Sequence, residues 1–160
     1  MAGILKCLIF MFMLFNCSQT IIGSQNISQI EFPLQSAEQN GRMVIVDSSG
    51  KRVKLACVNW SGAQLEGYVV NGLDKQPLSF IAEKIASMGF NCIRLVNSLD
   101  VIYKNPIIDP ERLTANPDLV GKTALDIHDE VVKALTDANL MVVVNNHMSN
   151  AGKNATKQKC

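Results

Sequence analysis

Three apolar runs separated by two amphipathic segments constrain the fold of this chain more than any other feature of its sequence. The runs lie at residues 55–59, 90–97 and 140–145, and their length and composition indicate buried strands. Between them, apolar residues recur at helical spacing over residues 77–89 and 123–139. Strands that alternate with helices pair in parallel through right-handed crossovers. The sequence therefore predicts an α/β domain with three parallel strands and two helices.

The ends of both predicted helices carry ordinary start and stop signals. Pro77 suits the first turn of the first helix, and Gly89 can close that helix in the left-handed conformation. Thr123 and Asp126 have the spacing of a capping box at the start of the second helix, and Asn139 can end it.

The segments outside this alternation are a hairpin and a long loop. Residues 24–40 are rich in Gln, Ser and Asn and are predicted to be a polar lead-in. A hairpin is predicted from residues 42–46, with a turn at 47–50 and a return through 52–55. Residues 99–122 are predicted to be a loop, and a loop of that length after a strand's carboxyl end is usually functional or disordered.

The N-terminal residues have the pattern of a secretory signal. Lys6 precedes the short apolar run at residues 8–15, and small or polar residues follow at 17–18 and 23–24. The run is shorter than the roughly 20 apolar residues that span a bilayer, and no other stretch is long enough. Residues 1–23 are therefore predicted to be a signal peptide of a secreted protein, the alternative being an N-terminal anchor or a buried helix.

Charge and cysteine usage narrow the classes of partner. The formal net charge is +1 without a long basic block, which argues against a nucleic-acid surface and favours a neutral partner. No spacing of cysteines and histidines matches a zinc site. Cys57 and Cys92 lie in apolar runs and are predicted to be small buried hydrophobic residues, whereas Cys160 has no evident mate.

Polar and aromatic residues follow the predicted strands where each strand ends. Trp60 follows the first strand, Arg94 lies in the second, and Asn146 and His147 follow the third. Because the carboxyl ends of parallel strands share one edge of a sheet, these side chains should converge. An aromatic face can stack on a sugar ring, a guanidinium can bind a carboxylate, and a histidine can donate, accept or titrate. The set predicts a site for a neutral, hydroxyl-rich ligand beside a carboxylate.

Each of these residues also has a structural interpretation. Trp60 can be a core aromatic, Arg94 can form a structural salt bridge, and His147 can be a hydrogen-bonded structural residue. His128, in the middle of the second helix, is predicted to be a solvated or packing residue. A nucleotide-binding α/β domain has the same element order, but no G-x-G-x-x-G or G-x-x-x-x-G-K-[ST] motif follows a strand.

Three stretches carry a resemblance to a known family. They are "VKLACVNWSGA", "IAEKIASMGFNCIRLVNS" and "VVVNNHMSNAG", and together they resemble the first three strands of glycoside hydrolase family 5, the cellulase family. The likeness covers residues 41–152 and is most specific at residues 89–95 and at the Asn146-His147 pair.

The resemblance implies a fold and a chemistry. The fold would be a partial (β/α)8 TIM barrel, made of the hairpin, the first three parallel strands and two helices. The family hydrolyses β-linked glycans with retention, using two glutamates and no metal or organic cofactor. By resemblance, Arg94 would orient the nucleophilic carboxylate, His147 and Asn146 would line the substrate site, and Trp60 would be a wall of the site or a core residue.

The chain also departs from the family pattern. In the family both catalytic glutamates follow later strands, so the resemblance leaves no catalytic residue in this chain and implies that the chain alone is inactive. Residues 153–160 diverge from the family and are predicted to be a separate tail. The last strand should present an open apolar edge. The alternative function is that of a secreted, non-catalytic glycan-binding module, and the choice of β-linked glycan is not indicated by the sequence.

Overall fold

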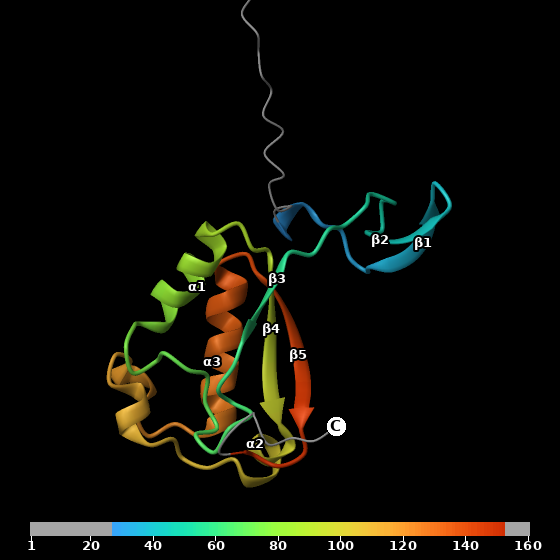
Figure 1. Cartoon of the computed structure of the whole chain (residues 1–160). Coiled ribbons are helices and arrows are strands. Elements are labelled where there is room, and N and C mark those ends of the chain that lie inside the picture. Colours follow the sequence, from blue (N-terminus) through green and yellow to red (C-terminus); the bar gives the residue numbers. More distant parts are fainter. Residues whose placement is uncertain (1–26, 153–160) are drawn as a thin grey trace, which may run out of the picture.

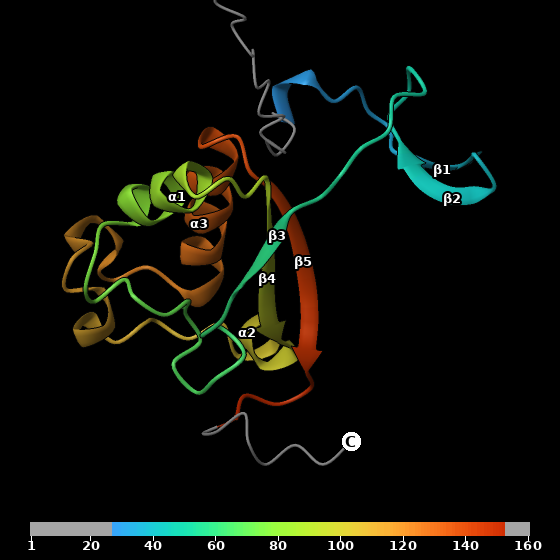
Figure 2. The ribbon, with the colours of Figure 1, turned by 45° about the horizontal axis from the view of Figure 1, so that its top comes forward.

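A three-stranded parallel sheet forms the centre of the fold in the computed structural model of the chain, which describes residues 27–152. Its strands, in spatial order, are β3 (Cys57–Trp60), β4 (Cys92–Ser98) and β5 (Met141–Met148). Two helices, α1 (Leu78–Ser87) and α3 (Ala124–Asp137), lie on the same face of this sheet, as Figures 1 and 2 show. The predicted parallel sheet with flanking helices is confirmed.

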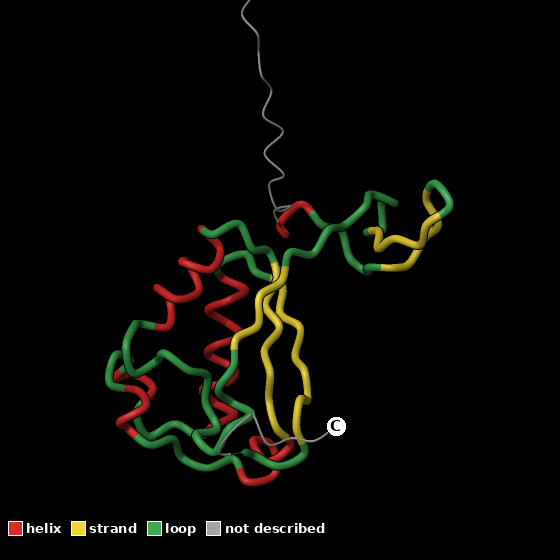
Figure 3. Tube along the Cα trace, viewed as in Figure 1, coloured by secondary structure: helices red, strands yellow, loops and turns green. Residues whose placement is uncertain are grey.

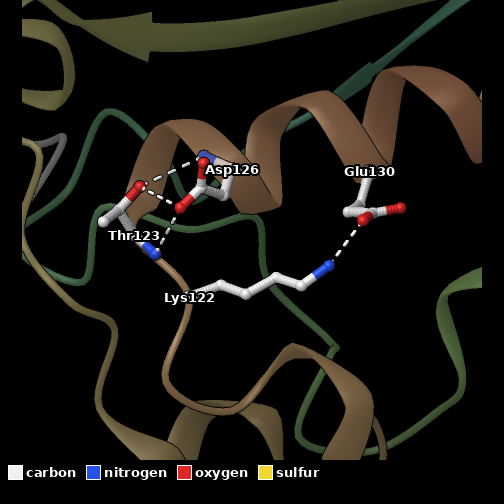
Figure 4. A network of polar contacts seen from close by, with 4 residues as sticks. All are labelled: Lys122, Thr123, Asp126 and Glu130. Atoms are coloured by element: carbon white, nitrogen blue, oxygen red, sulfur yellow. Dashed lines mark hydrogen bonds and ion pairs between the residues drawn. The ribbon is translucent and has the colours of Figure 1, made fainter.

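The helix α3 begins where the sequence predicts. Thr123 accepts a hydrogen bond from the backbone N–H of Asp126, and the Asp126 carboxylate accepts one from the backbone N–H of Thr123 (Figure 4). Just outside this capping box, Lys122 forms an ion pair with Glu130. The buried stripe of the helix consists of Ala124, Ile127, Val131 and Leu135. This stripe holds α3 against the sheet.

Side chains alternate across β4 and divide the sheet into two faces. Ile93 and Leu95 are fully buried in the core cluster beneath the helices. Successive residues of a strand point to opposite faces, so Arg94 lies on the face that the helices leave open. We call this second face the open face of the sheet.

The segment predicted to be a single loop, residues 99–122, contains short helices, and the prediction was wrong there. They are α2 (Leu99–Lys104), η2 (Pro110–Leu113) and η3 (Pro117–Leu119). Each is too short to show a helical repeat in the sequence. Asn116 ties this segment to the start of α1, because its amide accepts from Leu78 N at 2.7 Å and donates to Leu73 O at 2.7 Å. Figure 3 shows how much of this segment is helical.

The hairpin is displaced from its predicted position. It pairs β1 (Gln35–Gln39) with β2 (Arg42–Val46), preceded by the short helix η1 (Ile27–Gln29). The turn is Asn40-Gly41, both at positive φ, as the two-residue turn that matches strand twist requires. The predicted return strand at 52–55 contributes only the isolated bridge between Val46 and Arg52. The predicted polar lead-in therefore contains a strand, whose polar composition concealed it.

Cys57 and Cys92 form a disulfide, which was not predicted; Cys92 is buried as predicted, whereas Cys57 is exposed, so the prediction that both are buried was wrong. They are register partners in the β3–β4 ladder, with their Cα atoms 4.2 Å apart. The sequence shows both cysteines, but their pairing depends on the register of two strands, and the cysteines are 35 residues apart in the sequence.

The strand β5 lies at the edge of the described sheet, as predicted. Val143 and Val144 are 42% and 57% exposed, although they belong to the apolar run of this strand. Among residues 27–152, no helix is long and apolar enough to cross a membrane. The predicted signal peptide at 1–23, the start of the lead-in and the tail at 153–160 with Cys160 lie outside the described residues.

Replacing Cys57 and Cys92 together by alanine should lower the free energy of unfolding by about 4 kcal/mol, because the cross-link closes a 35-residue loop in the unfolded chain. Urea denaturation of the wild-type chain, with and without a reductant, and of the double variant measures this change. Equal midpoints for all three samples would contradict the assignment of the disulfide.

Candidate functional site

The carboxyl ends of the three parallel strands meet at one end of the sheet, the lower end in Figure 1. In the ladder, Asn59 of β3 is the register partner of Arg94 of β4, and Arg94 is the partner of Val143 of β5. Two residues further along, Asn145 pairs with Val96. Strand pairing therefore brings Arg94, Asn59 and Asn145 together on the open face.

Arg94 is held on the open face by two side-chain amides. Its Nη2 donates to Oδ1 of Asn145 at 2.7 Å, and its Nη1 makes a longer contact with Oδ1 of Asn59 at 3.5 Å. Within residues 27–152, no carboxylate forms an ion pair with Arg94. The structural salt bridge considered for Arg94 thus has no partner in the described part of the chain. Its guanidinium lies beside neutral acceptors.

His147 lies in a β-bulge near the end of β5. Asn146 pairs with Asn97, but the next pair along the ladder joins Met148 to Ser98. His147 is therefore the extra residue, without a register partner, and its side chain is exposed. Bulges occur next to binding sites because they change the direction of a side chain. Asn146 is also exposed, so both predicted residues are accessible to a ligand.

Trp60 packs in the core rather than standing at the rim. Its side chain is 8% exposed and belongs to the core cluster under the helices. The indole Nε1 donates to the backbone oxygen of Asn71 at 2.9 Å, which satisfies its only polar group. Of the two alternatives for Trp60, the structure places it as a core residue, and its predicted contact with a ligand stays a prediction.

His128 lies on the opposite face from Arg94. Its Nε2 is 3.0 Å from Nδ2 of Asn97, which alternates with Arg94 on β4. With Asn97 donating, Nε2 accepts and carries no proton, and partial burial lowers the pKa of the His128 ring below its usual value of about 6.5. The sequence predicts a solvated or packing residue at this position, and the structure shows a packing residue whose lowered pKa favours the neutral ring.

The surface around Arg94 therefore combines one guanidinium with the side-chain amides of Asn59 and Asn145, and the exposed imidazole of His147 lies further along β5. Such a surface can donate to and accept from the hydroxyl groups of a neutral ligand, and Arg94 can bind a carboxylate that approaches it. Among the described residues, no group of three His, Cys, Asp or Glu side chains could hold a metal ion.

Asn59 and Asn145 were recognised in the sequence only as strand-end residues, and their role as partners of Arg94 was missed. The sequence signal for this role is weak, because the two asparagines can be assigned to Arg94 only when the register of the strands is known. The bulge at His147 has no sequence signal that we can identify.

Comparison with known families gives a match to the model described as cellulase (glycosyl hydrolase family 5), over residues 46–159. A protein of Chamaecyparis obtusa described as a glycosyl hydrolase 5 family protein is 36% identical, with 68% of this chain and 22% of that protein covered. The major extracellular endoglucanase of Xanthomonas campestris pv. campestris is 26% identical, with 84% and 28% covered. The chain thus spans about a quarter of the length of these curated relatives.

Solved structures of endoglucanases also match the fold of this chain. The catalytic domain of the Xanthomonas campestris endoglucanase matches with a TM-score of 0.64 at 27% identity, covering 72% of this chain and 33% of that one. A complex of an endocellulase variant from Pyrococcus horikoshii with cellotetraose matches with a TM-score of 0.58 at 28% identity, covering 76% and 33%.

The stability of the chain should depend on pH through His128. The unfolded ring takes up a proton near pH 6.5, whereas the folded ring does so only at lower pH. The free energy of unfolding should therefore fall as the pH drops below about 6.5, until the lowered pKa is passed. Urea denaturation between pH 7.5 and 5 should show this loss in the wild type and a smaller one in His128→Gln. Identical slopes in both proteins would refute this assignment.

The hydrogen bond between Asn145 and Arg94 should contribute to folding. Replacing Asn145 by alanine should cost about 1–2 kcal/mol, because it leaves a half-buried guanidinium without its closer acceptor. Asn146→Ala is the matched control, since this neighbouring exposed amide should change stability by no more than about 0.5 kcal/mol. The prediction fails if denaturation gives the same loss for both variants.

Proposed function

Because the chain belongs to glycosyl hydrolase family 5, the cellulase family, we propose that it forms part of the glycan-binding site of a retaining glycoside hydrolase. In this proposal its hairpin, parallel strands and helices are the first portion of a (β/α)8 TIM barrel, and the open face of the sheet is the barrel interior. The observation that carries the proposal is the position of Arg94, which is held by neutral amides on that face.

The chemistry of retaining hydrolysis fits this arrangement. One carboxylic acid protonates the leaving oxygen while a second carboxylate attacks the anomeric carbon. The attacking carboxylate must be ionised, and a guanidinium at hydrogen-bond distance favours that state. Arg94 would supply this contact, and Asn145 would keep its guanidinium in place until the carboxylate arrives. His147 and Asn146 would bind sugar hydroxyls beside the bond that is cleaved.

Between residues 27 and 152, no carboxylate is hydrogen-bonded to Arg94, and Glu130 and Asp126 are engaged at α3 instead. We therefore propose that these 160 residues bind glycan without cleaving it. The same observation favours the second candidate, a secreted non-catalytic glycan-binding module.

The substrate we propose is a β-linked glucan. The solved structure with cellotetraose supports this choice, since a cello-oligosaccharide has the neutral hydroxyl groups that the open face can bind. Secretion is supported by the apolar run at residues 8–15 and by the extracellular endoglucanase among the relatives. The proposal requires no cofactor.

Cellotetraose binding to the full chain, measured by calorimetry, tests the proposal. His147→Ala should weaken binding about three- to tenfold, the loss of one or two hydrogen bonds. His128→Gln is the matched control, because His128 lies on the helix-covered face and its replacement should leave the affinity unchanged. Equal losses in both variants, or no binding by the wild type, would overturn the glycan site.

A parallel assay for reducing sugars tests the second half of the proposal. The full chain should release none from cellotetraose or from soluble cellulose. Measurable hydrolysis that is lost in Arg94→Ala would show that this chain carries a complete catalytic site.

A further inference from the structure

The segment that follows His147 is fastened at two points. The backbone N–H of Ala151 donates to the Asp100 carboxylate at 2.9 Å, and that of Gly152 donates to the backbone oxygen of Gln64 at 3.3 Å. Gly152 also forms an isolated parallel bridge with Leu65. Residues 149–152 are thereby fixed to α2 on one side and to the β3–α1 connection on the other.

Asp100 is the centre of this arrangement. Its side chain is only 13% exposed, and it accepts a second bond from Lys104 Nζ at 2.9 Å, one turn along α2. Lys104 Nζ in turn lies 3.4 Å from the Tyr68 hydroxyl and 5.9 Å from the centre of its ring. The bonds from Lys104 and from the Ala151 amide lower the pKa of Asp100, which keeps it ionised at neutral pH.

The Tyr68 backbone has an unfavourable conformation. Its φ is +56°, in the left-handed region that aromatic residues rarely adopt. Such conformations persist only where surrounding contacts fix them, and they are concentrated at functional sites. Ala151, Asp100, Lys104 and Tyr68 form a chain of contacts across three connections at the carboxyl end of the sheet, which we call the clasp.

The clasp follows the His147 bulge along the chain after both β4 and β5. On β4 the bulge ends at Ser98, two residues before Asp100, and on β5 it ends at Met148, three residues before Ala151. The ladder fixes Asn146 before His147 and Met148 after it, and the bond between Asp100 and Ala151 fixes the chain three residues beyond Met148. An unpaired bulge residue takes its direction from the constraints on its two sides.

We propose that Asp100 is a positioning residue, which sets the direction of the His147 side chain toward bound glycan by holding the backbone N–H of Ala151. This inference rests on the proposed glycan site. Lys104 and Tyr68 act through Asp100, because they hold its carboxylate in the position that Ala151 requires.

A solvent-exposed ion pair on a helix would not position another residue. The chain contains such a pair, which can be compared with Asp100 and Lys104. Lys133 and Asp137 have the same i,i+4 spacing on α3, but their side chains are 68% and 64% exposed. Asp137 therefore serves as the matched control for Asp100.

The experiment compares Asp100→Ala, Asp100→Asn and Asp137→Ala in the full chain. One measurement is the NMR chemical shifts of the His147 ring, with the His128 ring as internal reference, and the other is cellotetraose affinity. Asp100→Ala should move the His147 ring signals, leave those of His128 in place and weaken binding about three- to tenfold. Asp100→Asn keeps an oxygen acceptor for Ala151 and should retain most of the affinity, whereas Asp137→Ala should change neither quantity.

Two results would overturn the proposal. One is a set of His147 ring signals that is the same in the wild type and in both Asp100 variants. The other is an equal change in Asp137→Ala, which would make the effect a general loss of stability. If the wild type binds no cellotetraose while Asp100→Ala still moves the His147 signals, the glycan function fails and the positioning by Asp100 stands.

Discussion

The register of the three parallel strands is the constraint on which the rest of this structure depends. Cys57 and Cys92 fix it covalently between β3 and β4. Asn91 extends it to both neighbours, because its amide bonds to the backbone of Ala56 and Lys54 and its carbonyl oxygen accepts from the backbone N–H of Met141. A shift of one residue in the pairing register would exchange the two faces of a strand. The Arg94 side chain would then point into the core.

With this register, burial of apolar surface decides which face becomes the site. The helices α1 and α3 cover one face, and the side chains of β4 on that face are buried. Arg94, Asn145 and Asn59 are left together on the other face, where the charge of the guanidinium meets neutral amides. The site and the core are thus two consequences of the same alternation along the strands.

Much of the fold could be predicted from the sequence, because helical and strand periodicity and the capping pair at Thr123 are local signals. The convergence of strand ends in parallel sheets predicts Arg94, Asn146 and His147 as site residues, and their contact with a ligand stays a prediction. The disulfide, the partners of Arg94 and the bulge could not, since each depends on pairing between distant strands. The hairpin was misplaced although Asn40-Gly41 is a strong turn signal, because the more apolar segment after it appeared to be the better partner.

The central claim is that the open face of the sheet, at the carboxyl ends of the strands, binds a β-linked glucan. The most direct measurement is a titration of the full, isotope-labelled chain with cellotetraose, followed by NMR of the backbone and side-chain amides. The largest changes should occur at Arg94, Asn145 and His147, with little change along α1 and α3. Changes confined to the helices, or none at saturating ligand, would contradict it.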